Sequence, residues 1–147
     1  MLHFEADKDF PQAPADLWAK LSDARFLVQT VPGVETVKKA EPRQAVWTLR
    51  PGLSFMRGTL EITLTILEAV SETSLRVLAH SKGIGSTSDV DALLTFTPHD
   101  GGTRIHWIAD VKELGGLLKA VPQGLLKASA QKVIADVWAA LEAKLAG

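Results

Sequence analysis

GGLLKAVPQGLLKASAQKVIADVWAALEAKLAG, residues 115–147, is the segment around which the rest of this chain must be arranged. After two glycines it follows a helical pattern in which positions four apart are apolar at every step but one. That row is Leu117, Val121, Leu125, Ser129, Val133, Val137, Leu141 and Leu145. A helix this apolar needs a large surface to cover. We expect it to lie across the concave face of a curved antiparallel sheet, an arrangement that easily leaves a cavity between the two.

The helical segment is interrupted near its start by Pro122 and Gly124. Positions four apart drift around a helix by about 40° per step, so one straight helix cannot point all eight side chains inward. We therefore predict a short entry segment around Leu117–Leu118, a main helix from about Pro122, and the mouth of the cavity at the break. The row of this helix that faces water should contain Gln123, Lys127, Gln131, Ala135 and Ala139.

Strand patterns dominate the preceding sequence. Residues 2–10 alternate apolar and polar side chains, as a strand with one buried face does. Pro14 suits the first turn of a short helix, and Asp23 is a candidate N-cap for a second one, which ends before the turn at residues 31–33. From residue 34 to residue 111 about six strands alternate with short turns, which implies antiparallel pairing.

These elements predict an α+β helix-grip fold: a curved antiparallel sheet of about seven strands wrapped around a long C-terminal helix, with two short helices after the first strand. We expect a single domain over residues 1–147, since a chain of this size can bury roughly 68–70% of its unfolded surface.

Composition excludes several classes of function. The chain has no cysteine, so disulfides, thiolate metal sites and cysteine nucleophiles are absent. A net charge of -1 gives no general attraction for nucleic acid. No window is apolar enough to span a bilayer, and residues 1–5 carry acid where a signal peptide would carry base. We expect a cytoplasmic protein, and leave open a peripheral association with the inner face of the membrane.

The apolar phase of the strands supplies the candidate cavity lining, and the same pattern is typical of a solid core. The strand candidates are Trp47, Leu49, Met56, Gly58, Leu60, Ile62, Leu75, Val77, Ala79, Ser81, Leu94, Trp107 and Ala109. The helical candidates are Leu118, Val121 and Leu125. Trp47, Met56 and Trp107 could stack on a flat ring, and Gly58 indicates a bend or a ligand floor.

Candidates for catalysis or metal binding are weak, and we predict no catalytic residue, no metal site and no cofactor. His3, His80 and His106 fall on polar strand faces and His99 in a turn, so no ligand set converges. Ser81 and Ser88 could hydrogen-bond a carbonyl oxygen. Glu113 falls in the inward phase at the end of the last strand, where it could orient a polar ligand head or act as a general base.

The order of these elements, with the motifs that mark it, resembles the helix-grip fold of the START-like ligand-binding and polyketide-cyclase superfamily, and most closely the CoxG family of carbon monoxide dehydrogenase subunits. The motifs are Pro14 with Trp18, VPGVE at 31–35, MRG at 56–58, GGTRI at 101–105 and Gly115-Gly116, followed by Leu118, Leu125, Ala130 and Lys132. The family often carries a membrane-associating extension after the helix, which ends here at residue 147, and Pro122 replaces a helix-compatible residue.

Three hypotheses for function remain. The resemblance implies a protein that binds an apolar or amphipathic molecule, such as a quinone or lipid, as an accessory to a molybdenum-containing oxidoreductase such as carbon monoxide dehydrogenase. An enzyme of the cyclase, hydratase or isomerase type could use the same cavity, and an inward-facing Glu113 or Asp110 would favour it. The third hypothesis is a module that docks on an oxidoreductase and binds no small molecule.

Overall fold

The computed structural model describes residues 2–50 and 58–146, which form seven strands, three α-helices and one 3-10 helix. The strands are β1 (Leu2–Phe10), β2 (Val34–Ala40), β3 (Gln44–Leu49), β4 (Leu60–Val70), β5 (Ser74–Gly83), β6 (Ser86–His99) and β7 (Gly102–Gly116). The helices are α1 (Pro14–Leu21), α2 (Ala24–Thr30), η1 (Leu117–Ala120) and α3 (Gln123–Ala146).

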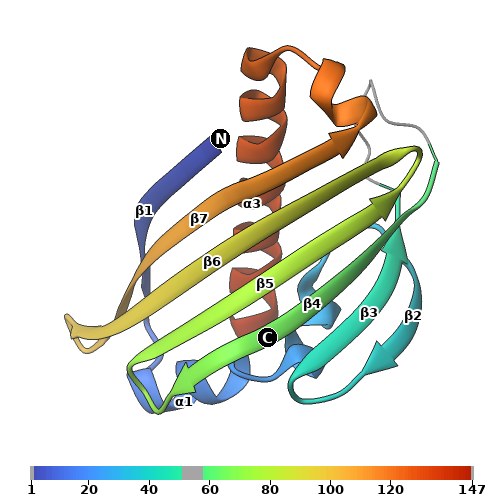
Figure 1. The fold of residues 1–147 in the computed structure, drawn as a ribbon. Coiled ribbons are helices and arrows are strands. Elements are labelled where there is room, and N and C mark those ends of the chain that lie inside the picture. Colours follow the sequence, from blue (N-terminus) through green and yellow to red (C-terminus); the bar gives the residue numbers. More distant parts are fainter. Residues whose placement is uncertain (1, 51–57, 147) are drawn as a thin grey trace.

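All seven strands form one antiparallel sheet in the order β1-β7-β6-β5-β4-β3-β2. The first strand pairs with the last along its whole length, from Leu2 opposite Val111 to Phe10 opposite Thr103. The sheet curves around α3, which crosses its concave face, while α1 and α2 lie at the end of the sheet near the C-terminus of α3 (Figure 1). The predicted helix-grip fold is confirmed.

Local chemistry places the two short helices where the sequence predicts them. Pro14 occupies the first turn of α1. A carboxylate oxygen of Asp23 accepts a hydrogen bond from the backbone N–H of Arg25 at 2.9 Å, which caps α2. Val31 is extended before Pro32, and Gly33 turns the chain with a φ of +77°.

The main core lies at the α1 and α2 end of the sheet. Leu17, Leu21, Leu75 and Ile105 are almost completely buried there. The C-terminal half of α3 joins this core through Leu141 and Leu145, which are its two buried residues, and its backbone approaches α2 most closely. The C-terminal half of the helix is therefore the half that anchors it.

The predicted inward row of the terminal helix is wrong in its first half. Leu117, Leu125 and Val133 are 63%, 42% and 44% exposed. The side chains that pack toward the sheet are Leu126, Ala130, Ile134, Trp138, Leu141 and Leu145. The reason is the break: Val121 is extended between η1 and α3, so the helical phase set by Leu117 does not continue past Pro122. The predicted water-facing row is exposed throughout.

The junction between β7 and η1 depends on Gly116. Its φ is +62° and its ψ is -134°, a conformation that residues with a Cβ rarely adopt. A Cβ there would clash with the backbone oxygen of Gly85, which accepts a hydrogen bond from the N–H of Leu117. Glycine is therefore required where the chain leaves the sheet and turns toward α3.

We predict that Gly116→Ala lowers the free energy of unfolding by at least about 2 kcal/mol, because it adds backbone strain to a clash with Gly85. Gly124→Ala is the matched control, since its Cβ would meet nothing within 4 Å in the first turn of α3. That control should raise stability by about 0.4–1 kcal/mol. Urea denaturation measures both; equal effects of the two substitutions would contradict the role given to Gly116.

Candidate functional site

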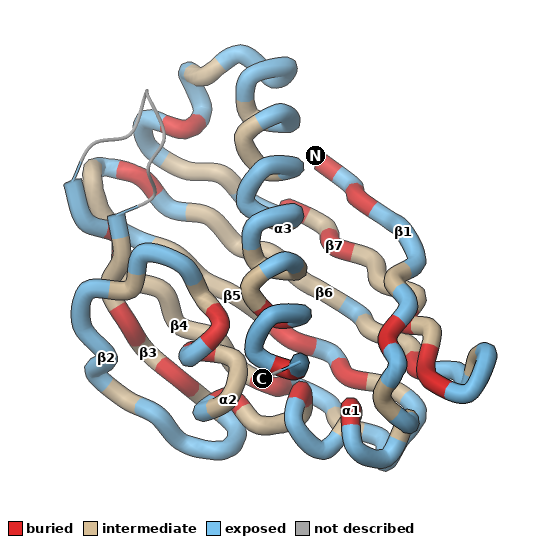
Figure 2. The backbone as a smooth tube through the Cα atoms, turned by 180° about the vertical axis from the view of Figure 1, so that it is seen from behind, coloured by how far each residue is buried: buried red, intermediate tan, exposed pale blue. Residues whose placement is uncertain are grey.

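The concave face beneath α3 is buried at its ends and only half-buried in the middle. Ile62, Ala79 and Leu94 are half-buried, whereas Ile66 and Phe96, on the same face nearer the strand ends, are buried. Figure 2 shows this change along β5 and β6. Solvent therefore reaches apolar side chains in the middle of the sheet.

A groove of about 430 Å³ opens between the edge strand β1 and α3. Phe4, Trp107, Ile134 and Trp138 form its apolar floor. The remaining lining residues are Glu5, Ala6, Asp7, Lys8, Gln131, Ala135, Ala139 and Glu142. The groove thus joins an apolar floor to a charged rim.

Two aromatic contacts shape the floor. The ring centroid of Trp138 lies 6.0 Å from that of Trp107 and 5.9 Å from that of Phe10, with the planes tilted by 39° and 45°. Across the groove, the ammonium of Lys8 on β1 pairs with the carboxylate of Glu142 on α3. The indoles offer flat surfaces inside the groove, and the ion pair joins its two walls.

The residues predicted to line a cavity have three different environments. Buried ones are Trp47, Leu60, Leu75, Val77, Ala109 and Leu118. Half-buried ones are Leu49, Ile62, Ala79, Ser81, Leu94, Trp107 and Val121. Gly58 and Leu125 are exposed, and Met56 lies outside the described residues. Of the predicted residues that the structure describes, Trp107 is the one that also lines the groove.

The other floor residues of the groove were not among the predicted lining residues. Phe4 belongs to the apolar phase of the first strand, which the sequence reveals without linking it to a site. Ile134 and Trp138 belong to the inward row of α3, which lies one residue later in the sequence than predicted. Their signal was present, but it required the pairing of β1 with β7 and the restart of the helix.

Polar groups on the concave face are few among the described residues. The hydroxyls of Ser81 and Ser88 hydrogen-bond each other across β5 and β6. Trp47 is 3% exposed, and its indole N–H has no hydrogen-bond partner among residues 2–50 and 58–146. At the described concave positions of β3 to β7, the register leaves neither acid nor histidine.

The predicted inward orientation of Glu113 is wrong. A β-bulge interrupts the pairing of β6 with β7, so Asp89 faces Glu113 but the next residue, Val90, faces Val111. The extra residue changes the phase: Glu113 becomes exposed, and Leu114 takes the position opposite Ser88. Asp110 also lies on the convex face, where it accepts a hydrogen bond from His3. Neither acid can act on a ligand beneath α3.

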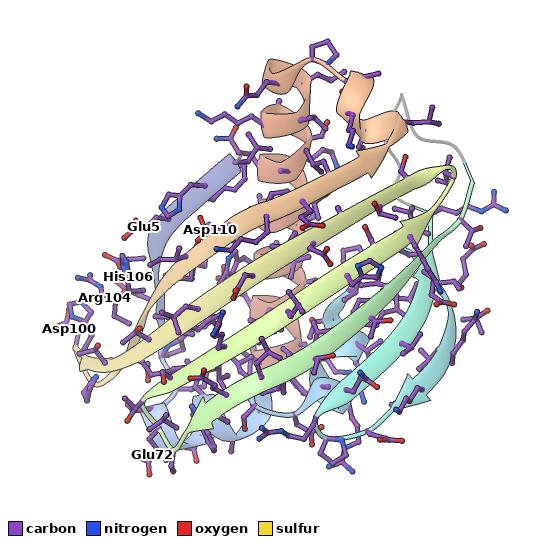
Figure 3. All side chains as sticks on the ribbon, in the orientation of Figure 1. Glu5, Glu72, Asp100, Arg104, His106 and Asp110 are labelled. Atoms are coloured by element: carbon purple, nitrogen blue, oxygen red, sulfur yellow. The ribbon has the colours of Figure 1, made fainter. Side chains whose placement is uncertain are left out.

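The convex face carries a chain of alternating acids and histidines over β1 and β7, part of which is labelled in Figure 3. His3 donates to Asp110 through Nδ1 and to Glu5 through Nε2 at 3.1 Å. His106 donates to Asp7 through Nδ1 and to Glu5 through Nε2, both at 2.7 Å. An imidazole can donate from both nitrogens only when it is protonated. In the described chain, no group of acids and histidines is arranged to hold a metal ion.

These contacts raise the pKa of both histidines. Asp110 and then Glu5 raise the pKa of His3, and Asp7 and then Glu5 raise that of His106. The hydrogen bonds to the two imidazoles lower the pKa of Glu5.

We predict NMR titration midpoints for His3 and His106 above the ordinary value of about 6.5. Because the folded state holds these protons more tightly, the stabilisation is complete below the unfolded pKa and is lost as pH rises through the folded pKa. Asp110→Asn should lower the pKa of His3 more than that of His106. Midpoints at or below about 6.5 would contradict the proposed protonation.

Comparison with solved structures identifies the class of protein. A conserved protein from Geobacillus kaustophilus superposes with a TM-score of 0.86 at 17% identity, covering 99% of this chain and 95% of that one. A START superfamily protein from Mycobacterium smegmatis has a TM-score of 0.69 at 12% identity, with 97% and 95% covered. Protein Ms6760 from the same organism has a TM-score of 0.68 at 19% identity, with 99% and 91% covered. The chain has a START-like fold.

Comparison with family models is more specific. The model of CoxG, a subunit of carbon monoxide dehydrogenase, matches residues 9–146, nearly the whole chain, and the chain belongs to this family. A comparison with curated protein sequences finds no significant match. None of the helices within the described residues is long and apolar enough to cross a membrane.

Proposed function

We propose that this protein binds one apolar or amphipathic small molecule between α3 and the concave face of the sheet, with the groove between β1 and α3 as the route of entry. The observation that carries this proposal is the aromatic floor of Trp107 and Trp138 beside a half-buried apolar surface. In a solid core, the middle of the concave face would be as buried as its ends.

The groove supports an amphipathic ligand. Its volume of about 430 Å³ falls within the range of roughly 300–1,000 Å³ that is typical of small-molecule sites. A flat ring could stack on Trp107 or Trp138, while a polar end stays at the rim near Lys8 and Glu142. A quinone or a lipid has this combination of properties.

Family membership supports an accessory role. We infer that the chain serves a molybdenum-containing oxidoreductase such as carbon monoxide dehydrogenase, the enzyme for which the family is named. Holding and transferring the ligand suits the site better than converting it, because neither Glu113 nor Asp110 faces the concave side. We place this exchange in the cytoplasm, at the inner face of the membrane where a lipid-soluble ligand would be found.

Binding of a fluorescent apolar probe, displaced by a panel of quinones and lipids, tests this function. We predict that Ala135→Phe weakens probe binding at least about tenfold, because a new ring on α3 would fill the groove that a ligand must enter. Ala128→Phe is the matched control, since Ala128 is exposed on α3 and does not line the groove. Melting curves of both variants separate loss of binding from loss of fold.

Two results would contradict the proposal. If wild-type protein bound no probe and no member of the panel, the module that docks without a ligand would be favoured. If Ala135→Phe and Ala128→Phe bound the probe as wild type does, the ligand would lie elsewhere.

A further inference from the structure

The indole N–H of Trp47 is a buried donor without an acceptor among the described residues. Trp47 is 3% exposed, and no described residue accepts a hydrogen bond from its Nε1. Most buried polar atoms in folded proteins are hydrogen-bonded, so a donor in this state requires an explanation. The chain satisfies another indole in an ordinary way: Trp18 donates from Nε1 to the backbone oxygen of Ser74 at 3.2 Å. The difference makes Trp47 a candidate for contact with a ligand.

Trp47 begins a row of residues that crosses the concave face. In the sheet register, Trp47 on β3 lies opposite Ile62 on β4, Ile62 lies opposite Ser81 on β5, and Ser81 lies opposite Ser88 on β6. The row ends at Leu114 on β7. Adjacent strands lie about 4.8 Å apart, so the backbones of Trp47 and Ser81 are separated by about 10 Å. An otherwise apolar face thus carries its polar groups at one level.

Access to this row comes from its middle. Ile62, Ser81 and Ser88 are all half-buried, and Leu49, the next inward residue on the strand of Trp47, is half-buried as well. A ligand seated on this surface would touch the side of the Trp47 ring without entering the main core. The serine hydroxyls can rotate, so one of them can donate to a ligand while the other keeps their mutual hydrogen bond.

We infer that the ligand carries an oxygen acceptor to which the indole N–H of Trp47 donates, and that the ligand lies along the row from Trp47 to Ser88. The inference rests on the proposed function and narrows its ligand class: a carbonyl, ether or hydroxyl oxygen is required, and a pure hydrocarbon lacks the group that Trp47 needs. Trp47 then determines specificity, because a bound molecule without an acceptor leaves its N–H unpaired.

The test uses two probes of nearly the same shape, menadione and 2-methylnaphthalene, which differ in the two carbonyl oxygens. Trp47→Phe removes the donor and keeps an aromatic ring. We expect this variant to bind menadione about 3- to 10-fold more weakly, as the loss of one hydrogen bond predicts, and to bind 2-methylnaphthalene nearly as wild type does. Equal losses for both probes, or none for either, would overturn the inference.

A measurement on the wild-type protein covers the case in which Trp47→Phe does not fold. In ¹H–¹⁵N spectra, the indole proton of Trp47 should move downfield and exchange more slowly when menadione is added, and should do neither with 2-methylnaphthalene. An indole proton that is unmoved by bound menadione would overturn the inference. If wild type bound neither probe nor any of the quinones and lipids, the proposed function itself would fail.

Discussion

Anchoring of α3 at its two ends is the constraint on which the rest of the structure depends. At one end, Leu141 and Leu145 are buried in the main core beside α1 and α2. At the other end, the backbone contact between Gly85 and Gly116 fixes the point where the chain leaves the sheet. Between these anchors the helix has no fully buried residue, so it covers the middle of the sheet without sealing it.

The two faces of the sheet have separate tasks, and β1 takes part in both. Its outward side chains, such as Glu5, join the chain of histidines and acids that ties β1 to β7. Its inward side chains, Phe4 and Lys8, form a wall of the groove and the ion pair with α3. Titratable chemistry is therefore concentrated on the convex face, and apolar surface on the concave face. This separation favours a protein that holds a molecule over one that transforms it.

Most of the fold could be predicted from the sequence because it follows from local patterns. Alternating side chains, Pro14, Asp23 and the glycine turns define the strands and short helices, and Pro122 marks the restart of the terminal helix. The site could be predicted less well, because it depends on phase and on long-range pairing. A single bulge near Lys112 turned Glu113 outward, and the restart after Pro122 moved Leu126 into the place expected for Leu125. The groove also needs β1, whose partner lies about a hundred residues away in sequence.

The central claim is that the space under α3 holds a small molecule in the working protein. Native mass spectrometry of the protein purified from its own source tests this most directly. The account predicts a species heavier than the 15.8 kDa chain by the mass of one small molecule, which solvent extraction releases as an apolar compound with at least one oxygen. A spectrum with only the bare chain, unchanged after incubation with quinones and lipids, would contradict it.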